Sequence, residues 1–177
     1  GGQYAQQFLF INQLLALAPE GVDVVVKFNP RPSDLTRFFK GVWVDNQKLY
    51  FASSEADSRS LLAKCVCVCT VTGSMGLEAL SVGKPVIVFG AAFYSRCPGA
   101  YAVRTHSDLS VALEKIFRGE VEVDEKEFVN FLKLLQLATF EGWVDHRYAS
   151  WSRLSAEENN DVLRSQIAQK IRKVVTR

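Results

Sequence analysis

Short apolar runs that alternate with helical segments constrain the fold of this chain more than any other feature. Three runs stand out, over residues 22–28 (VDVVVKF), 65–71 (CVCVCTV) and 84–90 (KPVIVFG). Because they are nearly continuous, they indicate strands that are buried on both faces, as in a parallel sheet. Segments with apolar residues at helical spacing separate them. This order predicts an α/β fold, a Rossmann-like open parallel sheet with helices on both faces.

Weaker patterns complete the series of elements. Two more short strands are expected, near residues 48–51 and within 99–104. The expected helices cover residues 3–17, the stretch from Ser33 or Asp34 to about Lys40, the end of 53–64, and residues 73–82, 107–118, 125–140 and 157–175. Gly83 and Gly119 follow two of these helices, in a position where glycine often ends a helix.

The length of 177 residues is enough for one domain with a full hydrophobic core. We expect a single Rossmann-like domain over residues 1–177, in which residues 120–177 are a helical extension that packs across it or reaches toward a missing neighbour. The Gly-Gly start, without Met or a basic leader, indicates a piece of a longer protein. A net charge of +2 without a Lys/Arg block argues against nucleic acid, and no apolar run reaches the ~18 residues that span a bilayer.

Three of the four cysteines, Cys65, Cys67 and Cys69, alternate along one predicted strand. Residues two apart in a strand share a face and lie about 6.5 Å apart. Tetrahedral zinc needs its sulfur ligands closer, usually from a turn, and a disulfide is also awkward at this spacing. We therefore expect no metal and interpret these residues as buried, reduced thiols, which suit a cytosolic protein.

A polar turn joins the second and third apolar runs. Thr72, Gly73 and Ser74 follow the strand, and Glu78 lies one helical turn later. Ligands of open parallel sheets bind beyond the carboxyl ends of the strands, and a helix start offers N–H groups to an anion. One interpretation is therefore a cradle for phosphate and sugar, in which Glu78 accepts hydrogen bonds from a ribose or base. The other is that Thr72 or Ser74 only caps the helix, since the turn is neither a Walker A nor a GxGxxG motif.

The string that begins at this turn resembles a known family. T-G-S-x-G-L-E-A-L (72–80), G-K-P-V-I-V-F-G (83–90) and A-F-Y (92–94) resemble the bacterial capsule polysaccharide synthesis glycosyltransferases, which include the transferases of Kdo, a sugar acid donated from CMP. The likeness covers roughly residues 22–118. It implies a GT-B fold, with two Rossmann-like halves and the active site between them, of which this chain would be the C-terminal, donor-binding half. The layout also recurs, more distantly, in polysialyltransferases and UDP-N-acetylglucosamine 2-epimerases.

The resemblance implies that Thr72–Ser74 contacts the nucleotide phosphate and that Glu78 holds the ribose. The upstream VVVKFNPRP resembles the family's K-x-H-P element, which contacts the nucleotide and is matched here by Lys27 and Pro30. Asn29 stands where the family has His, and an amide carries no charge and shuttles no proton. We infer that Arg31 can supply the missing charge by gripping phosphate.

A second departure follows Phe93. The family often continues with Gly-Trp-Gly after Phe-Tyr, where this chain reads SRCPGAY. Tyr94 and Arg96 are candidate contacts of the donor sugar, and Arg96 is equally well interpreted as a solvated surface residue.

Polar and aromatic residues outside these motifs are expected to be structural. They are His106 at a helix start capped by Ser107 or Thr105, His146, the aromatic residues Trp143, Tyr148 and Trp151, and a capping box of Ser155 with Glu158. For His146 and the three aromatic residues, a contact with a sugar or acceptor is the alternative.

The reaction that the resemblance implies is glycosyl transfer from a nucleotide sugar, with a CMP-linked acidic sugar as the expected donor. Hydrogen-bond donors in the turn, together with Lys27 or Arg31, would stabilise the negative charge on the leaving phosphate, without a metal or other cofactor. We find no compelling general base, which two-domain transferases usually take from the other half. We therefore expect this chain to bind nucleotide weakly, without turnover.

The expected partners are a nucleotide sugar, a glycan or glycolipid acceptor, and the missing N-terminal half or capsule-assembly proteins. The expected location is the cytoplasm, either free or at the cytosolic face of the inner membrane. Two alternatives stay open: a UDP-sugar 2-epimerase-like domain, and a degenerate, non-catalytic module that docks a partner in capsule assembly.

Overall fold

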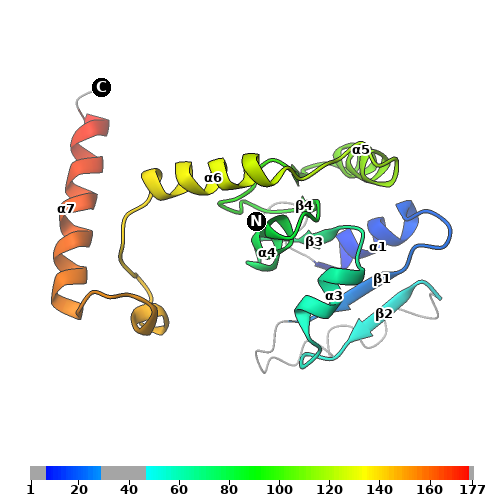
Figure 1. The fold of residues 1–177 in the computed structure, drawn as a ribbon, viewed down its shortest axis with the longest axis horizontal. Helices are drawn as coiled ribbons and strands as arrows, with labels where there is room; N and C mark the ends of the chain where they lie inside the picture. The colour runs from blue at the N-terminus through cyan, green and yellow to red at the C-terminus, as the bar shows by residue number, and fades with distance from the viewer. Residues whose placement is uncertain (1–6, 29–46, 176–177) are drawn as a thin grey trace. The chain divides into compact units, whose positions relative to one another are not determined.

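The computed structural model describes residues 7–28 and 47–175 (Figure 1). Two compact units are distinguished along the chain, Gly1–Phe128 and Val129–Arg177. Several expected features lie outside the described residues, namely the helix from Ser33 or Asp34 to Lys40 and the site residues Asn29, Pro30 and Arg31.

Five short strands are described, and all of them belong to the first unit. They are β1 (Val24–Lys27), β2 (Leu49–Ala52), β3 (Val68–Thr70), β4 (Val86–Val88) and β5 (Ala100–Ala102). β1 pairs in parallel with β2, and the other three form a parallel sheet in the order β3-β4-β5. The predicted α/β class, with parallel strands flanked by helices, is confirmed. β3 is shorter than predicted, because Cys65–Cys67 precede the strand.

Helices alternate with the strands at the predicted places (Figure 1). They are α1 (Gln7–Leu17), α3 (Ser58–Lys64), α4 (Met75–Ser81), α5 (His106–Phe117) and α6 (Glu125–Ala138). Gly83 and Gly119 lie just past α4 and α5 with φ of 76° and 70°, a left-handed conformation that glycine adopts without strain. Thr105 caps α5 and forms a capping box with Asp108, so the expected helix start beside His106 is confirmed.

The hydrophobic core of the first unit lies between α1, α5 and the strands. One face of α1, one face of α5 and side chains from the strands contribute to this core. Its residues include Phe10, Ile11, Leu14, Ile87, Phe89, Val103, Leu109, Leu113 and Ile116. The rings of Phe10 and Phe89 stack with their centroids 4.6 Å apart. α4 packs on β3 and β4, and its buried residues Ala79 and Leu80 do not belong to this cluster. We infer that α4 covers the opposite face of that sheet.

The three alternating cysteines are free thiols, and Cys67 and Cys69 pack against this core. Interaction with the Cys67 thiol and burial together raise the pKa of Cys69 well above its usual value. Cys69 therefore stays protonated at neutral pH and behaves as a small apolar residue. In the described residues, no group of three or more His, Cys, Asp or Glu side chains is arranged to hold a metal ion.

The second unit contains the remainder of α6, a short 3-10 helix η2 (His146–Trp151) and α7 (Ala156–Val175). Ser155 and Glu158 form the predicted capping box at the start of α7, with hydrogen bonds of 2.8 and 3.3 Å. Asn159 is buried, and its amide binds both the N–H and the carbonyl of Trp143, at 2.7 and 2.9 Å. No helix among the described residues has the length and apolar content needed to cross a membrane.

Candidate functional site

The polar turn lies at the carboxyl end of β3, and the protein fixes its backbone at Gly73. Thr70 Oγ1 accepts a hydrogen bond from the Gly73 N–H at 3.0 Å. The hydroxyl of Tyr94 donates a hydrogen bond to the Gly73 carbonyl. Both polar backbone groups of Gly73 are therefore satisfied by partners from two different segments, which holds the turn in one conformation.

Two glycines let the segment after β4 approach this turn closely. A Cβ atom on Gly76 would lie 2.7 Å from Cε2 and Cζ of Tyr94. A Cβ atom on Gly90 would lie 2.7 Å from the carbonyl oxygen of Val71 and 2.9 Å from Cγ2 of Thr72. These separations are too short for any side chain, so the glycines are required by packing against the turn.

Three polar side chains at the turn remain exposed. Thr72, Ser74 and Glu78 all face solvent, and Glu78 lies in the first turn of α4. Ser74 occupies the N-cap position, but its side chain makes no capping hydrogen bond. The Ser74 hydroxyl therefore does not cap α4. Within the described part of the chain, no hydrogen bond engages the Thr72 hydroxyl or the Glu78 carboxylate, so all three groups are available to a ligand.

Tyr94 and Arg96, the two candidate sugar contacts, have different surroundings. Tyr94 is fully buried beneath the turn, and burial raises its pKa, so the hydroxyl remains a hydrogen-bond donor at neutral pH. In this position Tyr94 supports Gly73 rather than facing solvent. Arg96 is exposed in the same loop.

Phe93 belongs to the A-F-Y motif at residues 92–94, and the motif alone indicates no role for it. Its side chain is 61% exposed, an unusual fraction for a phenylalanine next to a fully buried tyrosine. The signal available in the sequence was only the pair of adjacent aromatic residues, Phe93 and Tyr94, and the structure shows that Tyr94 is buried while Phe93 is exposed.

The K-x-H-P-like element is represented in the structure by Lys27, the last residue of β1. Its Nζ donates a hydrogen bond to the carbonyl of Ser54 at 3.0 Å. In the portion of the chain that is described, no hydrogen bond or ion pair joins the Lys27 side chain to the turn, and Asn29, Pro30 and Arg31 lie outside that portion. The structure therefore brings the turn and the loop after β4 together, and it leaves the placement of this element as a prediction.

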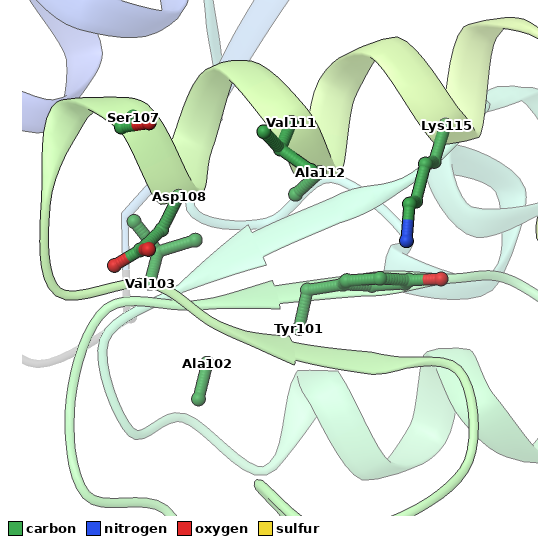
Figure 2. Close-up of a pocket in the computed structure, with 8 residues that line it drawn as sticks. All are labelled: Tyr101, Ala102, Val103, Ser107, Asp108, Val111, Ala112 and Lys115. Carbon is green, nitrogen blue, oxygen red and sulfur yellow. The ribbon is translucent and has the colours of Figure 1, made fainter.

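A depression of about 250 Å³ lies elsewhere, between β5 and α5 (Figure 2). Its lining residues are Tyr101, Ala102, Val103, Ser107, Asp108, Val111, Ala112 and Lys115. The Asp108 carboxylate there accepts hydrogen bonds from the N–H groups of Arg104 and Thr105, at 2.9 and 2.8 Å, which lower its pKa. Because this carboxylate already serves the helix cap, and because no turn residue lines the depression, we place the candidate site at the turn.

The aromatic residues of the second unit contact one another. The rings of Trp143 and His146 have centroids 4.9 Å apart, and those of Tyr148 and Trp151 5.4 Å apart. Two hydrogen bonds between the Trp143 backbone and the Asn159 side chain also anchor Trp143 to α7. Trp151 is 81% exposed, so its alternative role as a sugar contact stays a prediction.

The chain matches a family of known proteins. A family model described as "Capsule polysaccharide biosynthesis protein" matches residues 2–108, which is more than half of the chain. This range includes the turn, Glu78 and the loop after β4. No curated protein and no solved structure matches the chain.

Proposed function

The chain belongs to the capsule polysaccharide biosynthesis protein family, and from this premise we propose that it is the nucleotide-sugar-binding half of a glycosyltransferase that builds a capsular or surface polysaccharide. Membership of the family supports a role in capsule synthesis. The finer assignment, including a CMP-linked acidic sugar as donor, rests on the motifs at residues 72–80 and 83–94.

One observation carries the proposal: hydrogen bonds fix the backbone of the turn after β3, whereas the polar side chains of the turn are exposed and have no hydrogen-bond partner among the described residues. Thr70 and Tyr94 fix both polar groups of Gly73. The hydroxyls of Thr72 and Ser74 and the carboxylate of Glu78 stay exposed around it. A site whose backbone is already ordered loses little conformational entropy when a ligand binds. Such a site at the carboxyl end of a parallel strand is where α/β proteins bind nucleotides.

The side chains suit the phosphate and the ribose of a nucleoside monophosphate. The hydroxyls of Thr72 and Ser74 can donate to phosphate oxygens, and Glu78 can accept from the two ribose hydroxyls. Lys27 and Arg31 would add positive charge if the upstream element reaches the same ligand.

In the proposed reaction an acceptor hydroxyl attacks the anomeric carbon of the donor. The bond from that carbon to the phosphate oxygen breaks, and its electron pair leaves with the nucleotide. The turn hydroxyls stabilise the charge that develops on the leaving phosphate. The acceptor proton passes to a general base, which we assign to the other half of the enzyme.

Calorimetric titration of the chain with CMP, UDP and GDP tests this function. We expect CMP to bind, and we expect both Glu78→Ala and Lys27→Ala to weaken its binding. Glu20→Ala, which removes an exposed carboxylate far along the chain from the turn, is the matched control and should leave the Kd unchanged. A preference for UDP would favour an epimerase-like domain instead. Absence of binding to any nucleotide by the folded chain would contradict the proposal and favour a module that docks a partner.

A further inference from the structure

The exposed aromatic ring beside the turn extends the candidate site. We propose that Phe93 is the surface on which the nucleobase of the donor stacks. This inference rests on the proposed function, because it assigns the part of the nucleotide that Thr72, Ser74 and Glu78 do not reach. It adds Phe93 to the residues that would contact the donor.

The loop that carries Phe93 is ordered by its own hydrogen bonds. The Oγ and N–H of Ser95 both donate to the Ala92 carbonyl, at 2.7 and 3.0 Å. The Cys97 N–H donates to the Tyr94 carbonyl at 2.9 Å. Phe93 therefore projects from a well-defined turn of the chain, and its exposure does not result from a disordered segment.

Contacts on both sides of Phe93 tie this loop to the candidate site. Three residues before it, Gly90 lies against Thr72, so closely that a Cβ atom would be 2.9 Å from Cγ2 of that threonine. One residue after it, the Tyr94 hydroxyl binds the Gly73 carbonyl. Phe93 is thus held next to the turn that would receive the phosphate.

Tyr94 also orients the Phe93 ring. The two rings meet edge to face, with centroids 5.1 Å apart and an interplanar angle of 85°. This geometry is favourable for an aromatic pair. Since Tyr94 is fully buried, it supports the exposed ring from the protein side and leaves Phe93 accessible to a ligand.

A flat, apolar and exposed ring suits a nucleobase better than it suits the other parts of the ligand. Phosphate and ribose are polar and are served by hydroxyls and a carboxylate. Bases stack on aromatic side chains with little dependence on which base is present. Phe93 therefore contributes affinity for nucleotides in general, and discrimination between CMP and UDP must come from other residues.

The test compares CMP with ribose 5-phosphate, which has the same phosphate and sugar but no base. Two-dimensional NMR titrations of the full chain detect the weak binding that is expected here. We expect Phe93→Ala to raise the Kd for CMP by about 5- to 150-fold, the usual range for loss of one stacking contact. The Kd for ribose 5-phosphate should not change.

Three further variants distinguish stacking on an aromatic face from the effect of removing any exposed apolar side chain. Phe93→Trp keeps an aromatic face and should retain CMP binding. Phe93→Leu keeps an apolar side chain without that face and should bind like Phe93→Ala. Val82→Ala removes part of another exposed apolar side chain, just past the far end of α4, and should behave as the wild type.

The outcomes distinguish this inference from the proposed function. If the wild-type chain binds neither ligand, the proposed function fails and the inference fails with it. If the wild type binds CMP but Phe93→Ala binds it equally well, the stacking role is wrong and the proposed function stands. The stacking role is also wrong if Phe93→Ala weakens both ligands to the same extent, since that result indicates a disturbed turn.

Discussion

At the scale of single residues, the candidate site depends on Tyr94 more than on any exposed group. The buried hydroxyl of Tyr94 and the Oγ of Thr70 together hold the Gly73 peptide unit. The exposed residues around it can act on a ligand only while this conformation persists. Under the proposed function Tyr94 is therefore a positioning residue, because its full burial does not suit the contact with the donor sugar that the sequence analysis expected.

Tyr94→Phe tests that role, because it removes the hydroxyl and keeps the ring. The Gly73 carbonyl then keeps only the hydrogen bond from the Gly76 N–H, at 3.2 Å, and the loss of the Tyr94 hydrogen bond should lower the free energy of unfolding by about 1 kcal/mol. Urea denaturation measures this, and CMP titration should show weaker binding in parallel. Tyr50→Phe removes the hydroxyl of an exposed tyrosine and should change stability by less than about 0.5 kcal/mol. Equal stability of Tyr94→Phe and the wild type would contradict the assignment.

Gly76→Ala tests the packing between the turn and the Tyr94 ring. In an open helix position this change would stabilise by up to ~1 kcal/mol. Here the added methyl group would lie 2.7 Å from two ring carbons, so we expect a net loss of about 1–3 kcal/mol. The loss should shrink in a Tyr94→Ala background, which removes the ring. A double-mutant cycle by urea denaturation would show no coupling if the two residues do not touch.

At the scale of elements, acidic side chains cap three helices and make stability depend on pH. Hydrogen bonds lower the pKa values of Asp57, Asp108 and Glu158 in the folded state. For Asp57 the Ser60 hydroxyl is the main donor, followed by backbone N–H groups, and for Asp108 and Glu158 backbone N–H groups come first. A lowered folded pKa gives stability that is present above the unfolded pKa and is lost as the pH falls through the folded one. The ordinary pKa of the Asp108 side chain, from which the folded value is lowered, is 3.8.

We therefore expect stability to fall when the pH is lowered below about 4, the range in which unfolded Asp and Glu begin to take up protons. Thermal unfolding between pH 7 and pH 3 measures this. Asp108→Ala should lower the melting temperature at pH 7 and reduce the further loss at pH 3. Asp23→Ala, at an exposed carboxylate before β1, should leave both unchanged. An identical pH profile for Asp108→Ala and the wild type would show that this cap does not contribute.

α7 depends on one buried polar residue. Asn159→Ala leaves the N–H and the carbonyl of Trp143 without their partners in a part-buried setting. Each lost partner should cost about 1–3 kcal/mol. We expect the connection between α6 and α7 to become sensitive to protease, and tryptophan fluorescence to change. The neighbouring Asn160→Ala alters an exposed residue of the same helix and should have neither effect. Protection equal to that of the wild type would show that Asn159 does not anchor the connection.

At the scale of the whole molecule, the range matched by the family model is shorter than the first compact unit. The match ends at residue 108, whereas the first unit continues to Phe128. The second unit lies entirely outside the match. The proposed nucleotide site belongs to the first unit alone, because the turn, Glu78 and Phe93 all precede residue 108.

We expect this chain to bind a CMP-linked sugar without releasing CMP from it. The described residues near the turn include hydroxyls and a carboxylate but no histidine placed to take the acceptor proton. Chromatographic assay of CMP, with an acceptor glycan present, should give the rate of the buffer alone. Release above that rate, abolished by Glu78→Ala, would place the catalytic machinery in this chain and overturn the assignment of the base to the other half.

The sequence by itself determined the class of fold and most of its elements. Short apolar runs form strands, helical periodicity forms helices, and capping residues such as Ser155 with Glu158 set helix starts, because each of these signals acts over a few neighbouring residues. It also pointed to the turn after β3. Only the tertiary structure decided how that turn is held. Tyr94 lies 21 residues from Gly73, and their contact depends on which loop returns to which strand end. The same long-range packing explains why Gly76 has no side chain and why Phe93 faces solvent, since neither follows from local propensity.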